Sequence, residues 1–130
     1  MKIKQLAGVL ILAAVVICGI ILIAIRISLG PCKVDIITVY SGKEFEIKLD
    51  SNGTTGYLWQ LATPIDAAMI NLKQSEYIAP NTNLVGAPGI EKWTFIALKP
   101  GKARVSLKYV RPWEKGIAPV NKKEFKVIIR

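Results

Sequence analysis

The sequence contains no histidine, and it contains only two cysteines among its 130 residues. Without histidine there can be no Ser-His or Cys-His nucleophile pair, and the commonest zinc ligand is missing. Cys18 lies within an apolar run and Cys32 just beyond it, so neither is placed to supply a catalytic thiol or to cross-link a folded domain. The few carboxylates are dispersed through strand-like segments. These absences predict a protein that is not an enzyme and that uses no cofactor or metal.

A run without any charged residue extends from Leu6 to Ile25 and consists almost entirely of Ala, Val, Ile and Leu. As a helix, a run of about 20 apolar residues is long enough to cross the hydrocarbon core of a bilayer. Basic residues precede it, and they favour the cytoplasmic side of a membrane. We therefore expect a membrane-anchored protein with its folded domain on the extracytoplasmic side. Its predicted parts are a basic cytoplasmic tail (1–5), a transmembrane anchor or signal segment (6–26), a linker (27–33) and a folded domain (34–130).

Two other fates of the apolar segment stay open. A cleaved signal peptide would give a secreted domain, but its apolar stretch usually has about 7–15 residues. The one plausible cleavage site, Ser28-Leu29-Gly30, is also followed by Pro31. Lipid attachment at Cys32 would need a small residue before the cysteine, where this sequence has proline. We prefer the uncleaved anchor, with a lipid-anchored protein next and a secreted protein as the remaining alternative.

After Pro31 the hydrophobic pattern changes to period two. Phe45, Ile47 and Leu49 alternate with charged residues, which is the pattern of a half-buried strand. Turn-forming residues separate seven such segments, and no helical period of useful length follows the apolar run. Short strands at this spacing predict an all-β sandwich or barrel, with the sandwich favoured, that is held by packing alone. The predicted strands span 34–40, 43–50, 57–61, 71–79, 91–98, 103–109 and 122–130.

The predicted domain is basic. From Lys33 onward the sequence has 15 lysines and arginines against 9 aspartates and glutamates, a net charge of +6. A basic domain can bind nucleic acid or anionic lipid head groups. However, the basic residues are scattered through the alternating strands and form no run, and no nucleic-acid-binding module is visible. We expect a solvated basic surface and no nucleic-acid partner.

Three segments between the predicted strands have compositions that suit binding. Arg111-Pro112-Trp113 places an aromatic ring and a cation beside a rigid proline, and Trp and Arg are enriched among binding hot spots. This tryptophan either folds back on the core or is offered to a partner. Asn52-Gly53-Thr54-Thr55-Gly56 frames two hydroxyl groups with glycines, which permit positive φ. Gly86-Ala87-Pro88-Gly89 presents backbone suited to lying along a narrow cleft.

Together and in this order, the three segments resemble the chagasin family of cysteine-protease inhibitors. That family has an Asn-Pro-Thr-Thr-Gly loop, a Gly-x-Gly-Gly loop and an Arg-Pro-Trp loop. The flanking residues agree as well, with Gly56-Tyr57-x-Trp59 after the first segment and Trp93-x-Phe95 after the second. The resemblance covers about 34–130, and it implies an immunoglobulin-like antiparallel β-sandwich. Two positions depart from the family pattern: Gly53 replaces a proline and Pro88 replaces a glycine.

The resemblance also implies a function, which is reversible, non-covalent inhibition of papain-like cysteine proteases by a monomeric domain. Thr54 and Thr55 would lie nearest the thiolate and imidazolium of the enzyme. The segment 86–89 would follow the unprimed side of the cleft. Trp113 would stack on the primed side, held by Arg111 and Pro112. The alternative is a surface-displayed sandwich for adhesion or assembly, which would share the anchor and the fold but bind no protease.

Overall fold

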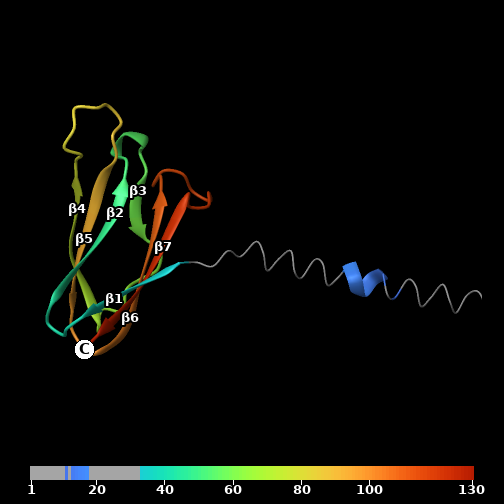
Figure 1. Ribbon diagram of the computed structural model, residues 1–130, viewed down its shortest axis with the longest axis horizontal. Helices are drawn as coiled ribbons and strands as arrows, with labels where there is room; N and C mark the ends of the chain where they lie inside the picture. The colour runs from blue at the N-terminus through green and yellow to red at the C-terminus, as the bar shows by residue number, and fades with distance from the viewer. Residues whose placement is uncertain (1–10, 12, 18–32) are drawn as a thin grey trace, which may run out of the picture. The chain divides into compact units, whose positions relative to one another are not determined.

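The computed structural model describes residues 11, 13–17 and 33–130, and the last range forms one folded domain (Figure 1). Residues 13–17 are helical. Within these ranges, no helix combines the length and the apolar character that a membrane crossing requires. The predicted tail (1–5), most of the predicted anchor (6–26) and nearly all of the linker (27–33) lie outside the described residues.

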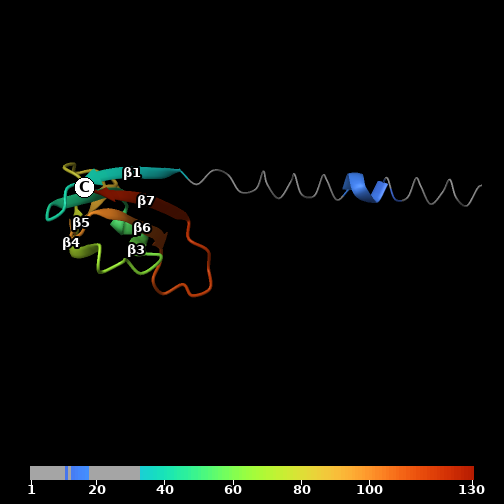
Figure 2. The same cartoon turned by 90° about the horizontal axis from the view of Figure 1, so that it is seen from below.

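The domain consists of seven strands in two sheets. One sheet has the order β1-β7-β6-β3 and the other has the order β2-β5-β4. Seen along the sheets, the two layers pack face to face (Figure 2). The all-β sandwich is therefore confirmed, and every strand end lies within two residues of its predicted position. The strands are β1 (Val34–Val39), β2 (Glu44–Ser51), β3 (Leu58–Leu61), β4 (Ile70–Ile78), β5 (Gly89–Ala97), β6 (Gly101–Val110) and β7 (Asn121–Ile129).

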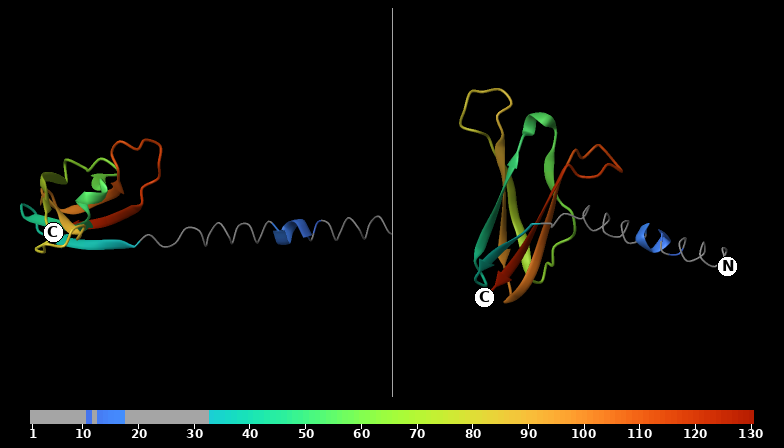
Figure 3. Two further views of the ribbon diagram at one scale, coloured as in Figure 1. Left: turned by 90° about the horizontal axis from the view of Figure 1, so that it is seen from above. Right: turned by 45° about the vertical axis from the view of Figure 1, so that its right-hand side comes forward.

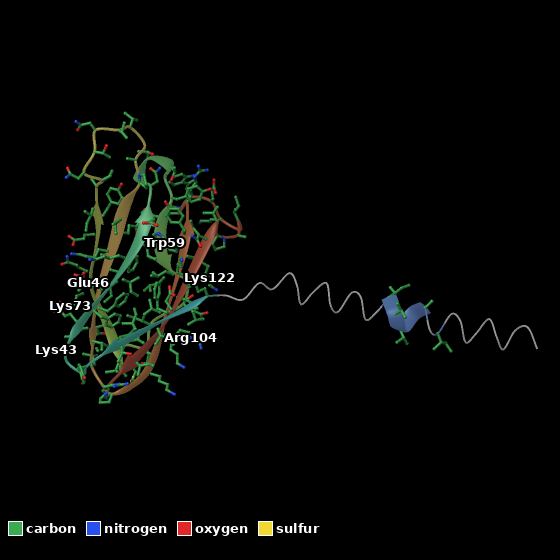
Figure 4. The ribbon with its side chains drawn as sticks, in the orientation of Figure 1. Lys43, Glu46, Trp59, Lys73, Arg104 and Lys122 are labelled. Atoms are coloured by element: carbon green, nitrogen blue, oxygen red, sulfur yellow. The ribbon has the colours of Figure 1, made fainter. Side chains whose placement is uncertain are left out.

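The core lies between the two sheets and follows the period-two pattern. Strand β2 alternates strictly between exposed and buried residues, and its buried apolar side chains are the predicted Phe45, Ile47 and Leu49. Phe95 of β5 is completely buried and stacks on the ring of Phe45, with 5.3 Å between ring centroids. Trp59 of β3 is also buried and points into the domain (Figure 4). The alternation thus decides which face of each strand is buried.

One strand pairing differs from the antiparallel prediction, because β1 pairs in parallel with β7. Successive strands run in opposite directions, so the first and the seventh strand point the same way (Figure 1). They can lie side by side in one sheet only as a parallel pair. The antiparallel description holds for the other four strand pairings of the domain.

Because successive strands alternate in direction, the loops that follow β2, β4 and β6 are at the same end of the domain. The loops after β2, β4 and β6 all lie at the end of the domain opposite the C-terminus (Figure 3). The loop after β2 passes from one sheet to the other, whereas the other two are hairpin loops within a single sheet each. The sheet-crossing loop therefore lies between the two hairpin loops.

Glu91 of β5 fastens the base of the sheet-crossing loop. Its carboxylate accepts hydrogen bonds from the hydroxyl group of Ser51 (2.7 Å) and from the backbone N–H of Trp59 (3.2 Å). Ser51 ends β2 and Trp59 belongs to β3, so one side chain joins the strands on both sides of the loop. Strand β3 is an edge strand, and the carboxylate also covers an N–H group that has no strand partner.

We predict that Glu91→Ala lowers the free energy of unfolding by about 2 kcal/mol, because it leaves the buried Ser51 hydroxyl and the Trp59 N–H without their acceptor. Urea unfolding of the purified domain measures this loss. Glu44→Ala is the matched control, since it removes a carboxylate whose ion pair with Lys73 is exposed and worth about 0.5 kcal/mol. Equal losses for the two variants would contradict the bridging role of Glu91.

Candidate functional site

The candidate site is the end of the domain where three loops lie side by side. We call them the threonine loop (52–57), the glycine loop (79–88) and the tryptophan loop (111–120). They contain all the predicted site residues except Gly89, and they lie on the same side of the sandwich (Figure 3). Loops at opposite ends could not have acted on one partner surface, so this arrangement is the first requirement of a joint binding site.

The threonine loop is a closed turn that is fixed by its own side chains. Residues 53–55 form one turn of 3-10 helix, and the Asn52 side-chain oxygen caps it by accepting from the backbone N–H of Thr54 (3.2 Å). The hydroxyl of Thr54 donates to the same oxygen (2.6 Å), and the hydroxyl of Thr55 donates to the carbonyl of Asn52 (2.7 Å). Both hydroxyl protons are therefore used inside the loop. Asn52 is a residue that this loop shares with the family pattern, and its cap restricts the backbone of the turn although position 53 is a glycine.

The glycine loop is joined to the threonine loop by one hydrogen bond, from the Asn52 side-chain amide to the carbonyl of Gly86 (3.1 Å). Gly86 has φ +80°, a conformation that glycine adopts without steric cost. Ala87 is half-buried and Pro88 is exposed. Gly89 differs from the other predicted residues, because it begins β5 and is buried. A Cβ atom there would lie 2.5 Å from the Tyr77 hydroxyl, so this glycine lets the Tyr77 ring pack at the foot of the loop.

Arg111 joins the tryptophan loop to the threonine loop. Its Nε donates to the carbonyl of Thr55 (3.2 Å), and its guanidinium carbon lies 4.4 Å from the centroid of the Tyr57 ring. The guanidinium also pairs with the Glu114 carboxylate within its own loop (3.2 Å). A second link comes from β6, where the Tyr109 hydroxyl accepts from the backbone N–H of Asn52 (2.9 Å). The guanidinium thus positions the threonine loop in addition to its own loop.

Trp113 is an exposed residue and does not belong to the core. Its relative exposure is 66%, yet the ring packs closely over the threonine loop. A Cβ atom at position 56 would lie only 2.4 Å from the ring atom Cη2, so the ring fits only because Gly56 has no side chain. Gly56 also has φ +77°, which ends the 3-10 turn in the left-handed region. The structure therefore decides between the two alternatives for this tryptophan. It is held against a neighbouring loop and presented to solvent, next to the exposed Pro112.

The glycine loop carries an exposed apolar pair that is not among the predicted site residues. Leu84 and Val85 have relative exposures of 75% and 102%. They precede the Gly86 turn, where the backbone N–H of Ala87 donates to the carbonyl of Leu84 (3.4 Å). Two adjacent large aliphatic residues in a loop otherwise composed of Asn, Thr, Gly, Ala and Pro were the available signal. The exposed apolar surface of the site therefore comes from both outer loops.

A hollow of about 560 Å³ is lined by residues of the threonine loop, of β3 and of β4. Its lining also includes Trp93 of β5 and Trp113 of the tryptophan loop. Trp93 is buried, and its indole N–H has no hydrogen-bond partner. The threonine loop is supported by hydrogen bonds to the two neighbouring loops and by Tyr109 of β6, whose hydroxyl contacts Asn52 and whose ring lies 5.4 Å from that of Tyr57.

These observations define a class of protein. A β-sandwich that holds three loops together at one end, with Trp113, Leu84 and Val85 exposed on them, has the features of a protein that binds other proteins through its loops. The model of the chagasin family peptidase inhibitors matches residues 38–129 of this chain. The chain therefore belongs to the chagasin family, as its three loop motifs predicted. Members of this family inhibit peptidases, so the chain is not an enzyme.

Individual relatives agree with this assignment. Amoebiasin-2 of Entamoeba histolytica is 33% identical over 85 residues, which cover 65% of this chain and 69% of the relative. Chagasin of Trypanosoma cruzi is 34% identical over 82 residues, which cover 59% of this chain and 73% of the relative. The crystal structure of the cysteine protease inhibitor EhICP2 from Entamoeba histolytica is similar with a TM-score of 0.66. It is 29% identical and covers 75% of this chain and 87% of its own.

The packing of Trp113 on Gly56 yields a prediction. Gly56→Ala introduces a Cβ that displaces the ring, so we expect the indole N–H resonance of Trp113 to shift in an NMR spectrum of the labelled domain. Gly42→Ala is the matched control, since Gly42 has φ +78° but no atom within 4 Å of the added Cβ. Both variants should lose about 1–2 kcal/mol of stability from the left-handed backbone. An unchanged Trp113 resonance in Gly56→Ala would show that the ring does not depend on this glycine.

Proposed function

We propose that residues 34–130 inhibit papain-like cysteine proteases reversibly and without covalent chemistry, as one domain per enzyme molecule, by laying three loops across the active-site cleft. The observation that carries the proposal is the hydrogen-bonded contact of the threonine loop with both neighbouring loops. The relatives support the choice of target, because EhICP2 is a cysteine protease inhibitor.

In this proposal the threonine loop enters the catalytic centre. A substrate of such an enzyme lies in the cleft as an extended strand, whereas residues 53–55 form a closed helical turn. Thr54 and Thr55 already donate their hydroxyl protons within the loop. They would therefore offer the enzyme their oxygen lone pairs and methyl groups. No peptide bond of the loop would have the extended geometry that attack by the thiolate requires, so the inhibitor would bind without being cleaved.

The outer loops would contact the two sides of the cleft. Gly86, Ala87 and Pro88 would follow the unprimed side through backbone contacts, and the adjacent Leu84 and Val85 would add apolar surface there. Trp113 would stack on the primed side. Because Arg111 already joins the tryptophan loop to the threonine loop, and Asn52 joins the glycine loop to it, less conformational entropy would be lost on binding. An interface of this kind would bury about 1,600 Å² in total.

An inhibition assay tests the proposal. We expect the domain to inhibit papain reversibly, and Trp113→Ala to weaken inhibition by about 2 kcal/mol, roughly 30-fold, because it removes an exposed aromatic anchor. Tyr40→Ala is a matched control, since Tyr40 is equally exposed at 66% but lies at the turn between β1 and β2. Thermal unfolding should show both variants folded.

Two outcomes would contradict the proposal. A folded wild-type domain that leaves papain fully active at micromolar concentration would leave the adhesion or assembly role in its place. Equal inhibition by wild type and Trp113→Ala would show that the tryptophan loop does not contact the enzyme.

We also propose that residues 6–26 anchor the protein in a membrane with the domain on the extracytoplasmic side. The support is the uncharged run from Leu6 to Ile25 and the lysines before it. The full chain should then sediment with membranes after an alkaline wash, whereas a chain that begins at Lys33 should stay in the supernatant. Protease added outside intact cells should degrade the domain. A full chain that is released by the alkaline wash would contradict the anchor.

A further inference from the structure

The positive charge of the domain gathers on one face. In β6, the buried Ala103, Val105 and Leu107 point into the core, so the positions that alternate with them, from 102 to 108, lie on the outer face of the β1-β7-β6-β3 sheet, where Ser106 is covered and the other three are cationic. The same alternation applies in β7, where Phe125, Val127 and Ile129 are buried. The outer positions of these two strands carry five cations. We call them the basic face: Lys102, Arg104, Lys108, Lys122 and Lys126.

The strand register places cations directly opposite each other. Arg104 pairs with Lys126, and Lys108 pairs with Lys122. Like charges at opposed positions of a sheet destabilise it. Among the described residues, Glu124 is the one carboxylate on this face, and it forms an ion pair with Arg104 (3.2 Å). None of the four lysines of the basic face forms an ion pair with another residue that the structure describes. Most of the positive charge of this face therefore has no carboxylate beside it.

The outer face of the β2-β5-β4 sheet is organised differently. Glu46 forms ion pairs with Lys48 (3.5 Å) and Lys92 (3.7 Å), and Glu44 forms one with Lys73. Lys92 also pairs with Glu76, and its hydrogen bond with that carboxylate raises the pKa of Lys92. Lys73 and Glu46 lie on the side of the domain away from Arg104 and Lys122 (Figure 4). The domain is therefore electrically two-sided, with charges neutralised on one face and accumulated on the other.

Apolar side chains border the basic face. Val34 and Ile36 of β1 lie beside Glu124 and Lys126 in the parallel pairing, with relative exposures of 43% and 65%. Within the described residues, the strand positions of this face carry no aromatic side chain, and the exposed Tyr40 lies beyond the end of β1, so the face has no row of rings on which successive nucleobases could stack. Lysines and exposed aliphatic side chains on one face are complementary to a surface with negative charges on the outside and apolar groups just below them.

We propose that the basic face, together with Val34 and Ile36, binds the surface of a bilayer that contains anionic phospholipids. The lysines would contact head-group phosphates, and the two aliphatic side chains would enter the interfacial region. The proposal is independent of protease inhibition. An anchor at 6–26 would favour it, because the seven residues 27–33 reach at most about 25 Å when extended and would keep β1 close to the bilayer.

Vesicle binding tests the proposal with the domain alone. All the buried core residues of the described chain lie between Val39 and Ile129, so a chain of residues 33–130 contains the whole core and lacks the apolar run. We expect it to sediment with vesicles of phosphatidylcholine mixed with phosphatidylglycerol, and to stay in solution with phosphatidylcholine alone. Binding should weaken as salt is added, since salt screens the attraction.

Two double variants with the same change in net charge give the decisive comparison. Lys108→Gln combined with Lys122→Gln should weaken vesicle binding about 25-fold, since each lysine near an anionic surface is worth about a factor of five. This variant should unfold at the same or a higher urea concentration, because an opposed cation pair is removed. Lys48→Gln combined with Lys73→Gln changes the face whose charges are neutralised, and it should leave vesicle binding within about twofold. When the basic face lies on the bilayer, these two lysines are on the far side of the sandwich, farther from the lipid phosphates than the Debye length of about 10 Å at 0.1 M salt.

Several results would overturn the proposal. These are no binding to the anionic vesicles, equal losses for the two double variants, or tighter binding to an oligonucleotide than to the vesicles. Papain inhibition by the same variants keeps this test separate from the proposed function. Lys108 and Lys122 lie outside the three loops, so inhibition should be unchanged even if vesicle binding is lost.

Discussion

The arrangement of the site depends on the need of two amphipathic sheets to bury their apolar faces against each other. The chain satisfies this need by crossing from the β2-β5-β4 sheet to the β1-β7-β6-β3 sheet between Ser51 and Leu58. The crossing makes the threonine loop the only one of the three with one end in each layer. The hairpin loops of the two sheets then flank it. The order of the loops at the binding edge is thus a consequence of core packing, and Glu91 fixes the crossing point through Ser51 and Trp59.

The three loops owe their rigidity to different interactions from those that set their positions. The rigidity comes from hydrogen bonds between the loops, which centre on Asn52 and Arg111. Asn52 caps the turn, donates to a carbonyl of the glycine loop and receives support from Tyr109, so one residue restricts the backbone of the threonine loop. Ordering these loops costs conformational entropy when the domain folds. A loop that is ordered at that stage does not lose the same entropy again when a partner binds.

Much of the fold could be predicted from the sequence, because strand formation and burial follow local alternation. Phe45 and Val105 are assigned to the core by their neighbours alone. The parallel pairing of β1 with β7 and the basic face could not be predicted. Both depend on which strands become neighbours, and on a register that sets Arg104 against Lys126, 22 positions away in the sequence. A scattered distribution of lysines in the sequence is therefore compatible with a concentrated one in space.

The candidate site, like the fold, was predicted in part from the sequence. Its three segments were recognisable by composition, but the surroundings of Trp113 were undecided, because the glycine that receives its ring lies 57 positions earlier. Gly89 was grouped with the loop, although its neighbours Ile78 and Tyr77 place it inside the fold.

Because the three loops come from both sheets, binding at this end of the domain would also affect how firmly the two sheets stay packed together. A partner that touched all three tips at once would be attached to both layers of the sandwich. Sliding or separation of the layers would then have to break the complex first. By mass action, a bound partner would raise the free energy of such opened states relative to the closed domain. The increase would grow with the logarithm of the ratio of the partner's concentration to the dissociation constant. Occupancy of the edge would thereby protect the distant interior, including residues near the C-terminus that no partner touches.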